Sequence, residues 1–175
     1  MLVTGLPNVT FVEGRAHFGA WAIVSSPLVL SLDLLDEELL STWWPVIANP
    51  EALAINDAWF GGSGSLWRND SDSGLLGLYK PMARDGSSAA VLLLNSGNLT
   101  LQNVSISFDD IPGFAHAGRG VAARDVWARA GAFAGPLTGG GLSLPSPLES
   151  HDSVFYVLTS VATAGGGKKA AAEVA

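Results

Sequence analysis

Hydrophobic residues near the start of the chain recur at the three- and four-residue spacing of an amphipathic helix. Thr10 and Glu13 stand at the separation of a capping box, in which each side chain satisfies a free amide of the first helical turn. We therefore predict a helix that begins after Thr10 and ends before Pro27, because proline lacks an amide hydrogen and restricts the residue before it. The predicted apolar side of this helix consists of Phe11, Phe18, Trp21, Ala22 and Val24.

A short, almost wholly apolar run follows the predicted helix. Leu28–Leu32 has the composition of a β-strand that is covered on both faces, as in a parallel sheet. Asp36 then predicts the start of a second helix, with Glu37 and Glu38 favourably placed in its first turn. Pro45 is predicted to kink or end this helix. Its predicted buried side consists of Leu39, Leu40, Trp43 and Trp44. A helix, a buried strand and a helix together indicate the end of an α/β unit.

Beyond Gly61 the pattern changes to short β-type runs that alternate with turn residues. These runs recur at intervals of roughly ten residues, which is typical of an antiparallel β-sandwich. The predicted fold is therefore an α/β segment followed by an antiparallel β-sandwich, mainly β overall. The predicted strands are Leu75–Lys80, Ala89–Leu94, Leu99–Phe108, Ala122–Ala128 and Val154–Thr159, with weaker candidates at Ser65–Arg68 and Gly141–Leu144.

The same changes of pattern divide the chain into four predicted segments. Residues 1–60 form the α/β part, and residues 61–65 form a Gly- and Ser-rich linker. Residues 66–161 form the sandwich, whose length of roughly 100 residues is sufficient for a core of its own. Residues 162–175, rich in Gly and Ala, are predicted to be a disordered tail.

The composition is that of a folded chain, and it excludes several classes of function. Of the 175 residues 48% are hydrophobic and 14% are charged. The longest uncharged apolar-rich run, Phe18–Leu32, is shorter than the ~20 residues of a membrane-spanning helix, so we predict no membrane span. The net charge of −7, with no basic cluster before Lys168, argues against nucleic acid as a partner. The absence of cysteine excludes disulfides and thiol catalysis. Residues 1–10 lack the features of a secretory signal peptide, so we expect them to be chain interior.

Two stretches of the first 60 residues carry a family resemblance. His17–Leu34 and Trp44–Trp59 resemble the last part of the catalytic barrel of melibiase-type α-galactosidases, members of glycoside hydrolase family 27. The opening Met1 and Leu2 are similar to the end of the family's Asp-Pro-Asp-Met-Leu motif. Asn56–Trp59 resembles the Asn-Gln-Ala-Trp segment that ends the barrel in lower-eukaryote members, although Asp57 departs from the usual glutamine. The resemblance implies that residues 1–60 are the last strand and helices of a (β/α)8 (TIM) barrel and that a C-terminal β-sandwich follows.

The resemblance also implies an activity, the hydrolysis of terminal α-linked galactose by a retaining mechanism. Such enzymes use two carboxylates about 5 to 5.5 Å apart, one as nucleophile and one as acid and base. In the family these are aspartates at the ends of the fourth and sixth barrel strands, whereas the resemblance begins just after the seventh. We therefore expect no catalytic residue in this chain and no hydrolysis by the chain alone. Met1 is the one position that matches a family residue near the sugar, which makes it a candidate substrate contact.

The other expectations concern ligands and partners. We expect no cofactor and no bound metal. The expected partners are the α-galactoside substrate in the full-length enzyme, and either the missing barrel segment or a second copy of the chain.

The remaining acidic and histidine side chains are better explained by structural roles. Asp33 is expected to hydrogen bond to the loop before the second helix. Asp70 and Asp72 have a spacing similar to that of a calcium loop, but the third oxygen ligand is missing. The consecutive residues 151–153 (His, Asp, Ser) are not expected to form a triad, because neighbours in a strand point to opposite faces. Three tryptophans are expected in the core: Trp43, Trp44 and Trp127.

Asparagine usage indicates the cellular compartment. Asn8, Asn69, Asn98 and Asn103 all stand in Asn-x-Ser/Thr triplets, the acceptor sequence for N-glycosylation. This pattern, together with the resemblance, predicts a glycoprotein of the secretory pathway, either extracellular or vacuolar/lysosomal.

Two functions remain open at this point. In the first, the chain is the C-terminal part of an α-galactosidase and is hydrolytic only together with the rest of the barrel. In the second, it is a non-catalytic β-sandwich module for carbohydrate binding or domain docking. Upstream coding sequence with an in-frame Asp-Pro-Asp would favour the first.

Overall fold

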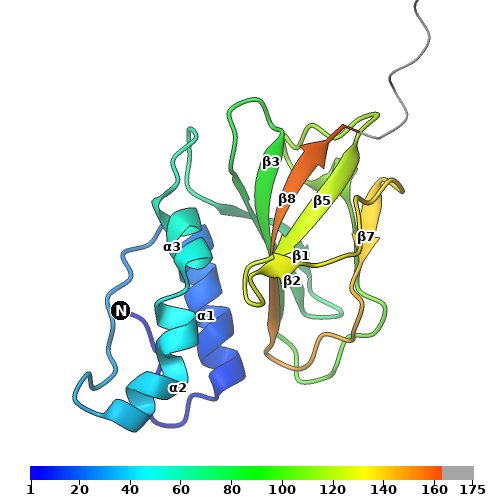
Figure 1. Cartoon of the computed structure of the whole chain (residues 1–175). Coiled ribbons are helices and arrows are strands. Elements are labelled where there is room, and N and C mark those ends of the chain that lie inside the picture. Colours follow the sequence, from blue (N-terminus) through cyan, green and yellow to red (C-terminus); the bar gives the residue numbers. More distant parts are fainter. Residues whose placement is uncertain (163–175) are drawn as a thin grey trace, which may run out of the picture.

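Three α-helices and eight strands make up the part of the chain that the structure, a computed structural model, describes, residues 1–162. The predicted tail at 162–175 therefore lies, apart from Ala162, outside the described residues. The helices lie together on one side of the molecule and the strands on the other (Figure 1).

A six-stranded antiparallel sheet forms the middle layer, with the strand order β1-β2-β3-β8-β5-β6. Two short strands, β4 and β7, pair on the side of this sheet away from the helices, next to a 3-10 turn, η1 (Figure 1). The predicted antiparallel β-sandwich is thus confirmed. The bounds are β1 Ser65–Asp70, β2 Leu75–Pro81, β3 Ser88–Asn95, β4 Ser105–Ser107, η1 Phe108–Asp110, β5 Gly120–Asp125, β6 Ala130–Gly131, β7 Gly141–Ser143 and β8 Ser153–Val161.

The central strand β3 is covered on both faces, which explains its continuous apolar sequence. Val91 and Leu93 belong to the core between the two sheets, whereas Ala90 and Leu92 belong to a second core beneath the helices. All four side chains are fully buried. Strand β3 pairs with β2 on one side and β8 on the other, so its backbone groups are also satisfied in the middle of the sheet.

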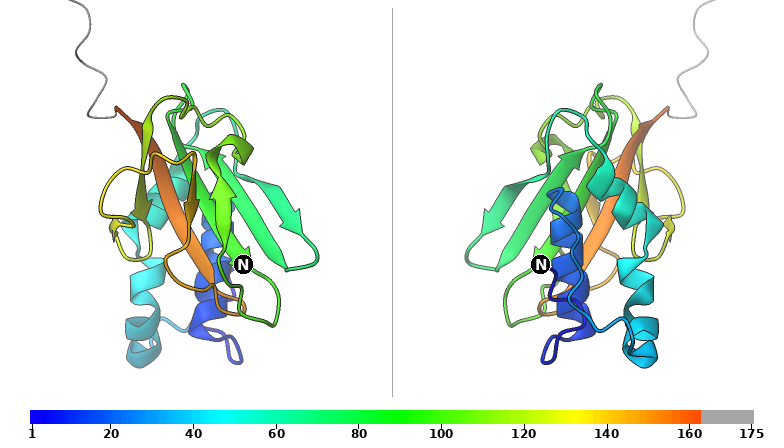
Figure 2. Two further views of the ribbon diagram at one scale, coloured as in Figure 1. Left: turned by 90° about the vertical axis from the view of Figure 1, so that its right-hand side faces the viewer. Right: turned by 90° about the vertical axis from the view of Figure 1, so that its left-hand side faces the viewer.

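Helix α1 (Phe11–Ile23) lies on one face of the six-stranded sheet, and α2 (Glu37–Ile47) and α3 (Pro50–Asp57) pack against α1 on the same side (Figure 2). The capping box of α1 is present: the Glu13 amide donates to the Thr10 hydroxyl, and the Thr10 amide donates to the Glu13 carboxylate over 2.9 Å. Asp36 caps α2 through the Leu39 amide. No helix within residues 1–162 combines the length and the apolar character that a membrane crossing requires.

The predicted strand at Leu28–Leu32 is wrong, because this segment is extended but belongs to no sheet. Only the Leu32 side chain is buried, and Val29 is 54% exposed. The one neighbouring backbone is the start of the chain: the Leu2 amide donates to the Val29 carbonyl over 2.9 Å, and the Ser31 hydroxyl donates to the Leu2 carbonyl. A single backbone hydrogen bond does not make a sheet ladder, so the apolar run remains irregular.

Three details of the helical part also differ from the prediction. Pro45 lies inside α2, which continues to Ile47 because Val46 and Ile47 are buried beneath it. Helix α3 was not predicted, although Asn49 and Pro50 are a suitable N-cap and first residue. Trp44 is 58% exposed, whereas Trp43 is buried as predicted.

The predicted strand at Leu99–Phe108 is much shorter than expected. Leu101 makes an isolated bridge to Leu148, and regular pairing is confined to β4. Asn103, between them, has a φ of 53°, in the left-handed region that interrupts an extended strand. The predicted strand at Ala122–Ala128 likewise ends at Asp125, where β5 turns toward β6.

Candidate functional site

Met1, the predicted substrate contact, lies at the exposed start of the chain. Met1 is 70% exposed, whereas the neighbouring Leu2 is buried beneath the helices. Met1 lines none of the hollows described below. Its role as a substrate contact stays a prediction.

The acidic residues Asp33 and Asp70 have roles in local structure. One Asp33 oxygen accepts from the Leu35 amide, as expected for a residue that orders the loop before α2. One Asp70 oxygen accepts from the amides of Asp72 and Ser73 in the β1–β2 turn. The Ser73 side chain, followed by these amides, lowers the pKa of Asp70. Within residues 1–162 no group of His, Asp or Glu side chains has the arrangement of a metal site.

The histidines have separate surroundings. His151 pairs with Asn98 over 3.1 Å, and His116 pairs with Asp109 over 3.0 Å. His17 packs at a tilt against Trp21, and burial lowers the pKa of His17. The stretch 151–153 does not form a triad, because Asp152 is paired with Arg15 instead.

All four asparagines of the glycosylation triplets are exposed: Asn8, Asn69, Asn98 and Asn103. They lie on different segments, before α1, in β1, after β3 and before β4 respectively. Exposure is the requirement that the folded protein sets for a glycan at these positions, and whether they carry one stays a prediction.

Lys80 of β2 joins the helices to the sheet and was not recognised from the sequence. Its side chain is fully buried, and its ammonium donates to the Ser25 hydroxyl over 2.6 Å and to the carbonyls of Ile55 and Asn56. The three donors of the ammonium are therefore all used. Both carbonyls lie at the C-terminal end of α3, where a positive charge is favourable. Burial lowers the pKa of Lys80, and the charge of Asp57 opposes this effect.

Two asparagines complete this connection. The buried Asn49 caps α3 through the amides of Glu51 and Ala52 and donates to the Val126 carbonyl at the end of β5 over 2.9 Å. Asn56 donates to the Ser26 carbonyl over 2.9 Å, just past the end of α1. The stretch that carries the family resemblance, Asn56 to Trp59, thus helps to hold α1, α3 and β2 together.

Two ion pairs lie at the edges of the same contact between helices and sheet. Arg15 of α1 pairs with Asp152 over 2.5 Å, and Arg124 of β5 makes a two-pronged pair with Glu51 of α3 at 2.6 and 2.9 Å. Across the predicted linker, the Gly64 amide donates to the Ile23 carbonyl at the end of α1. The helices are therefore fixed on the sheet by polar contacts as well as by a shared core.

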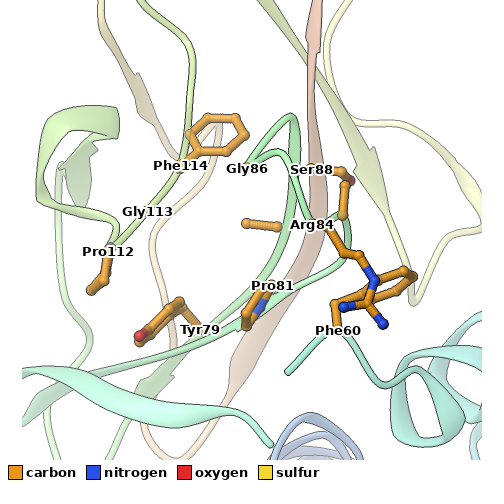
Figure 3. A pocket seen from close by; sticks show the side chains of 11 residues that line it. Phe60, Tyr79, Pro81, Arg84, Gly86, Ser88, Pro112, Gly113 and Phe114 are labelled. Carbon is orange, nitrogen blue, oxygen red and sulfur yellow. The ribbon is translucent and has the colours of Figure 1, made fainter. Parts of the chain in front are cut away.

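One surface hollow of about 330 Å³ lies beside the β2–β3 turn, and we call it the aromatic hollow (Figure 3). Phe60, Tyr79 and Phe114 contribute rings to it, and Arg84 also lines it. None of its lining residues is a carboxylate or a histidine. The aromatic hollow therefore lacks the two carboxylates that a retaining glycosidase uses.

A second hollow of about 430 Å³ lies between α1, the end of β5 and the loop before β8, and we call it the junction hollow. Two carboxylates line it, Asp125 and Asp152, but each already has a structural partner. Asp152 is paired with Arg15 and accepts from the Ser153 amide, while Asp125 accepts from the Ala128 amide. Each of these two carboxylates therefore has a role in local structure.

Comparisons with known proteins show which proteins this chain is similar to. Residues 78–158 match the family described as the alpha galactosidase C-terminal beta sandwich domain. An α-galactosidase of Cyamopsis tetragonoloba is 29% identical over 159 residues, which cover 91% of this chain and 35% of the relative. An α-galactosidase of Lachancea cidri is 34% identical over 119 residues, which cover 63% of this chain and 24% of the relative.

The solved structures agree in fold. The crystal structure of α-galactosidase I from Mortierella vinacea superposes with a TM-score of 0.78 at 22% identity, and the match covers 93% of this chain and 39% of that protein. The chain thus spans only about a third of the length of the α-galactosidases that it matches.

The fold, a β-sandwich with helices packed on its larger sheet, is shared with the part of the Mortierella vinacea α-galactosidase that the chain covers. The chain corresponds to the C-terminal part of the α-galactosidases, glycoside hydrolase family 27, and the predicted resemblance is confirmed.

Proposed function

We propose that this chain serves as the C-terminal part of a retaining α-galactosidase, where it supports a catalytic barrel and contributes no catalytic carboxylate. The substrate would be a galactoside with a terminal α-linked galactose. The α-galactosidases that the chain matches support this proposal, and so do the structural hydrogen bonds and ion pair that engage Asp125 and Asp152.

The observation that carries the proposal is the number of exposed hydrophobic residues in the helical segment. Of the thirteen large hydrophobic residues that are exposed within residues 1–162, eleven belong to the first 60. Leu35 is 91% exposed, Met1 70%, and Leu34 and Trp44 58% each. An exposed apolar surface of this kind is unusual on a monomer and marks a surface that packs against another element. The remaining strands and helices of a barrel are an occupant of matching chemistry.

The experiment is a chimera. The part of the Mortierella vinacea enzyme that this chain matches is replaced by this chain, and hydrolysis of p-nitrophenyl α-D-galactopyranoside is measured. We expect hydrolysis by the chimera and none by the chain alone, because the two carboxylates then come from the barrel. Secretion of the chimera from a eukaryotic host, followed by endoglycosidase treatment, tests in the same samples whether the four asparagine triplets carry glycans.

Two variants of the chimera form a matched pair of test and control, since each removes a cation that joins the helices to the sheet. Lys80→Met is expected to lower activity by detaching the helices, and Arg124→Met, at an exposed ion pair, to leave it nearly unchanged. Hydrolysis by the chain alone that a single substitution within it abolishes would contradict the proposal. So would a chimera that is folded and fully inactive.

The compartment follows from the same proposal. Four exposed asparagine triplets and the family relationship support a secretory, extracellular or vacuolar/lysosomal protein. A second function, a non-catalytic module that binds carbohydrate, is favoured by one feature, the junction hollow.

A further inference from the structure

The junction hollow exists because two neighbouring strands separate. The pairing of β5 with β8 ends at Asp125 and Tyr156, and the last backbone hydrogen bond runs from the Val126 amide to the Phe155 carbonyl. Beyond that point the first residues of β8 have no neighbouring strand on the β5 side. Arg15 of α1, Trp127 and the loop 144–148 surround the space that is left.

Polar atoms without a partner are concentrated at this hollow. Within residues 1–162, five buried side-chain nitrogen or oxygen atoms have no hydrogen-bond partner, and three of them belong to residues that line it. These three atoms are Nε of Arg15, Nε1 of Trp127 and Oγ of Ser153. Ser153 is only 2% exposed. Buried polar groups in proteins are almost always hydrogen-bonded, so three unpartnered groups around one hollow point to a ligand.

The side chains around these atoms are held rigidly. The Arg15 guanidinium is bound to Asp152 and lies over the Trp127 ring, 5.9 Å from its centroid. The Trp127 ring also meets Phe155 edge-on at 5.4 Å. The unpartnered atoms are therefore in place before any ligand arrives, which lowers the entropy cost of binding.

The charges and walls of the hollow select the class of ligand. The lining carries one positive and two negative charges, from Arg15, Asp125 and Asp152, which disfavours an anion. Two of the unpartnered groups are N–H donors, which disfavours a cation and requires acceptor oxygens. The remaining walls are largely apolar, and their side chains include Trp127, Tyr156 and the prolines of the 144–148 loop. The space is within the usual range of ligand sites, roughly 300 to 1,000 Å³.

A neutral molecule with several hydroxyl groups and an apolar C–H face meets all of these conditions. We propose that the junction hollow, through Arg15, Trp127 and Ser153, is a binding site for one neutral pyranose sugar unit. This inference rests on the second candidate function, carbohydrate binding by the chain itself, and names its site and ligand; it does not depend on the role of the chain in a barrel. The aromatic hollow is not proposed as such a site, since no unpartnered buried polar atom lies among its lining residues.

The test is calorimetric titration of the whole 175-residue chain with D-galactose, with sodium sulfate as the anionic probe in a second series. We expect galactose to bind with one site per chain and sulfate to give no heat of binding. Ser153→Ala and Trp127→Phe each remove one unpartnered group and keep the size of the side chain close to the original. Each is expected to weaken galactose binding about fivefold, the usual effect of one lost hydrogen bond.

Ser160→Ala is the matched control. Ser160 is on the same strand, is also buried, and its hydroxyl also has no partner, but it does not line the junction hollow. Its substitution should leave galactose affinity within about twofold of the original. If Trp127→Phe fails to fold, Ser153→Ala alone decides. Absence of galactose binding overturns the proposal, and so does binding that Ser153→Ala leaves unchanged or tighter binding of sulfate.

The two proposals can fail separately. An active chimera whose chain binds no galactose refutes only the sugar site. A chain that binds galactose at the junction hollow but yields a folded, inactive chimera refutes only the proposed function.

Discussion

The sandwich and the helical segment differ in how much of their hydrophobic core comes from their own residues. The core between the two sheets contains fifteen buried residues, all contributed by the chain from Leu75 to Leu158. The core beneath the helices closes only with four residues of the sheet and its edge, namely Ala90, Leu92, Val126 and Phe155. The sandwich can therefore exclude water from its own core, whereas the helical segment needs the sheet to cover one side of its core.

The two regions also differ at their surfaces. Within the described chain, the sandwich exposes only Leu66 and Leu99 among its large hydrophobic residues, and the other eleven belong to the first 60 residues. The helical segment thus buries part of its apolar surface against the sheet and leaves another part exposed. This difference is what the proposed function requires, in which the helical segment lies between the sandwich and the rest of a barrel.

The largest expected effect comes from emptying each core in turn. Phe18→Ala, in the core beneath the helices, and Phe108→Ala, in the core between the sheets, each remove a fully buried ring. Each should cost about 3 to 5 kcal/mol of the free energy of unfolding of the region it belongs to. We expect Phe18→Ala to make residues 1–60 sensitive to limited proteolysis and to leave a resistant sandwich fragment. Phe108→Ala should make both regions sensitive.

Resistance of the N-terminal region to protease would contradict this difference between the two regions. If residues 1–60 of the Phe18→Ala variant resist protease as long as the sandwich does, the two regions unfold as one unit. Mass spectrometry of the fragments locates the cut, which we expect near Gly61–Ser65.

The second effect concerns the attachment of one region to the other. Lys80→Met leaves the carbonyls of Ile55 and Asn56 without their buried donor, and we expect a loss of about 3 kcal/mol in the free energy of unfolding by urea. Arg124→Met is the matched variant, because the Arg124 pair with Glu51 also joins helix to strand but is solvent-exposed. Its effect should be much smaller. Equal effects of the two variants would mean that burial of the ammonium is not what holds α3.

The smallest effect is a dependence on alkaline pH that belongs to the sandwich alone. Burial raises the pKa of Tyr156 to about 12, with a further contribution from the charge of Asp125. In the unfolded chain this phenol ionises at its ordinary pKa near 10, so the folded state holds more protons between these values. The stability that Tyr156 contributes is therefore complete below about pH 10 and is lost as the pH rises toward 12, with about 1 kcal/mol lost at pH 11.

Urea denaturation at pH 9 and pH 11 measures this loss. Tyr156→Phe should remove the part of the pH dependence that Tyr156 causes, because phenylalanine does not titrate. A pH dependence that is the same in both proteins would show that Tyr156 is not its source.

Local signals in the sequence were reliable where both partners lie within one turn. The capping box of Thr10 with Glu13 and the cap at Asp36 are present as predicted, since each needs only a backbone amide three residues away. The strands β2, β3 and β8 also lie where the apolar runs predicted them. Helix α3 could have been found from Asn49 and Pro50, which together are a helix-start signal.

Local sequence signals were misleading where the structure of a segment depends on a partner far away in the chain. Leu28–Leu32 has the composition of a buried strand, but a strand forms only where neighbouring strands accept its hydrogen bonds. Within residues 1–162 the neighbour is the short segment at Leu2, which makes one backbone hydrogen bond to it. Lys80 stood at the end of a predicted strand, and no feature of that strand indicated that its charge is buried against α3.

The sequence by itself thus determined the helix starts, the main strands and the family resemblance, because these depend on residues close together in the chain or on short motifs. Only the tertiary structure decided that the helices share a core with the sheet, that Lys80 is buried, and that Arg15, Trp127 and Ser153 surround one hollow. Arg15 and its partner Asp152 are 137 positions apart, and contacts over such a distance are set by how the layers pack. Periodicity within a segment carries no information about which segment will lie opposite to it.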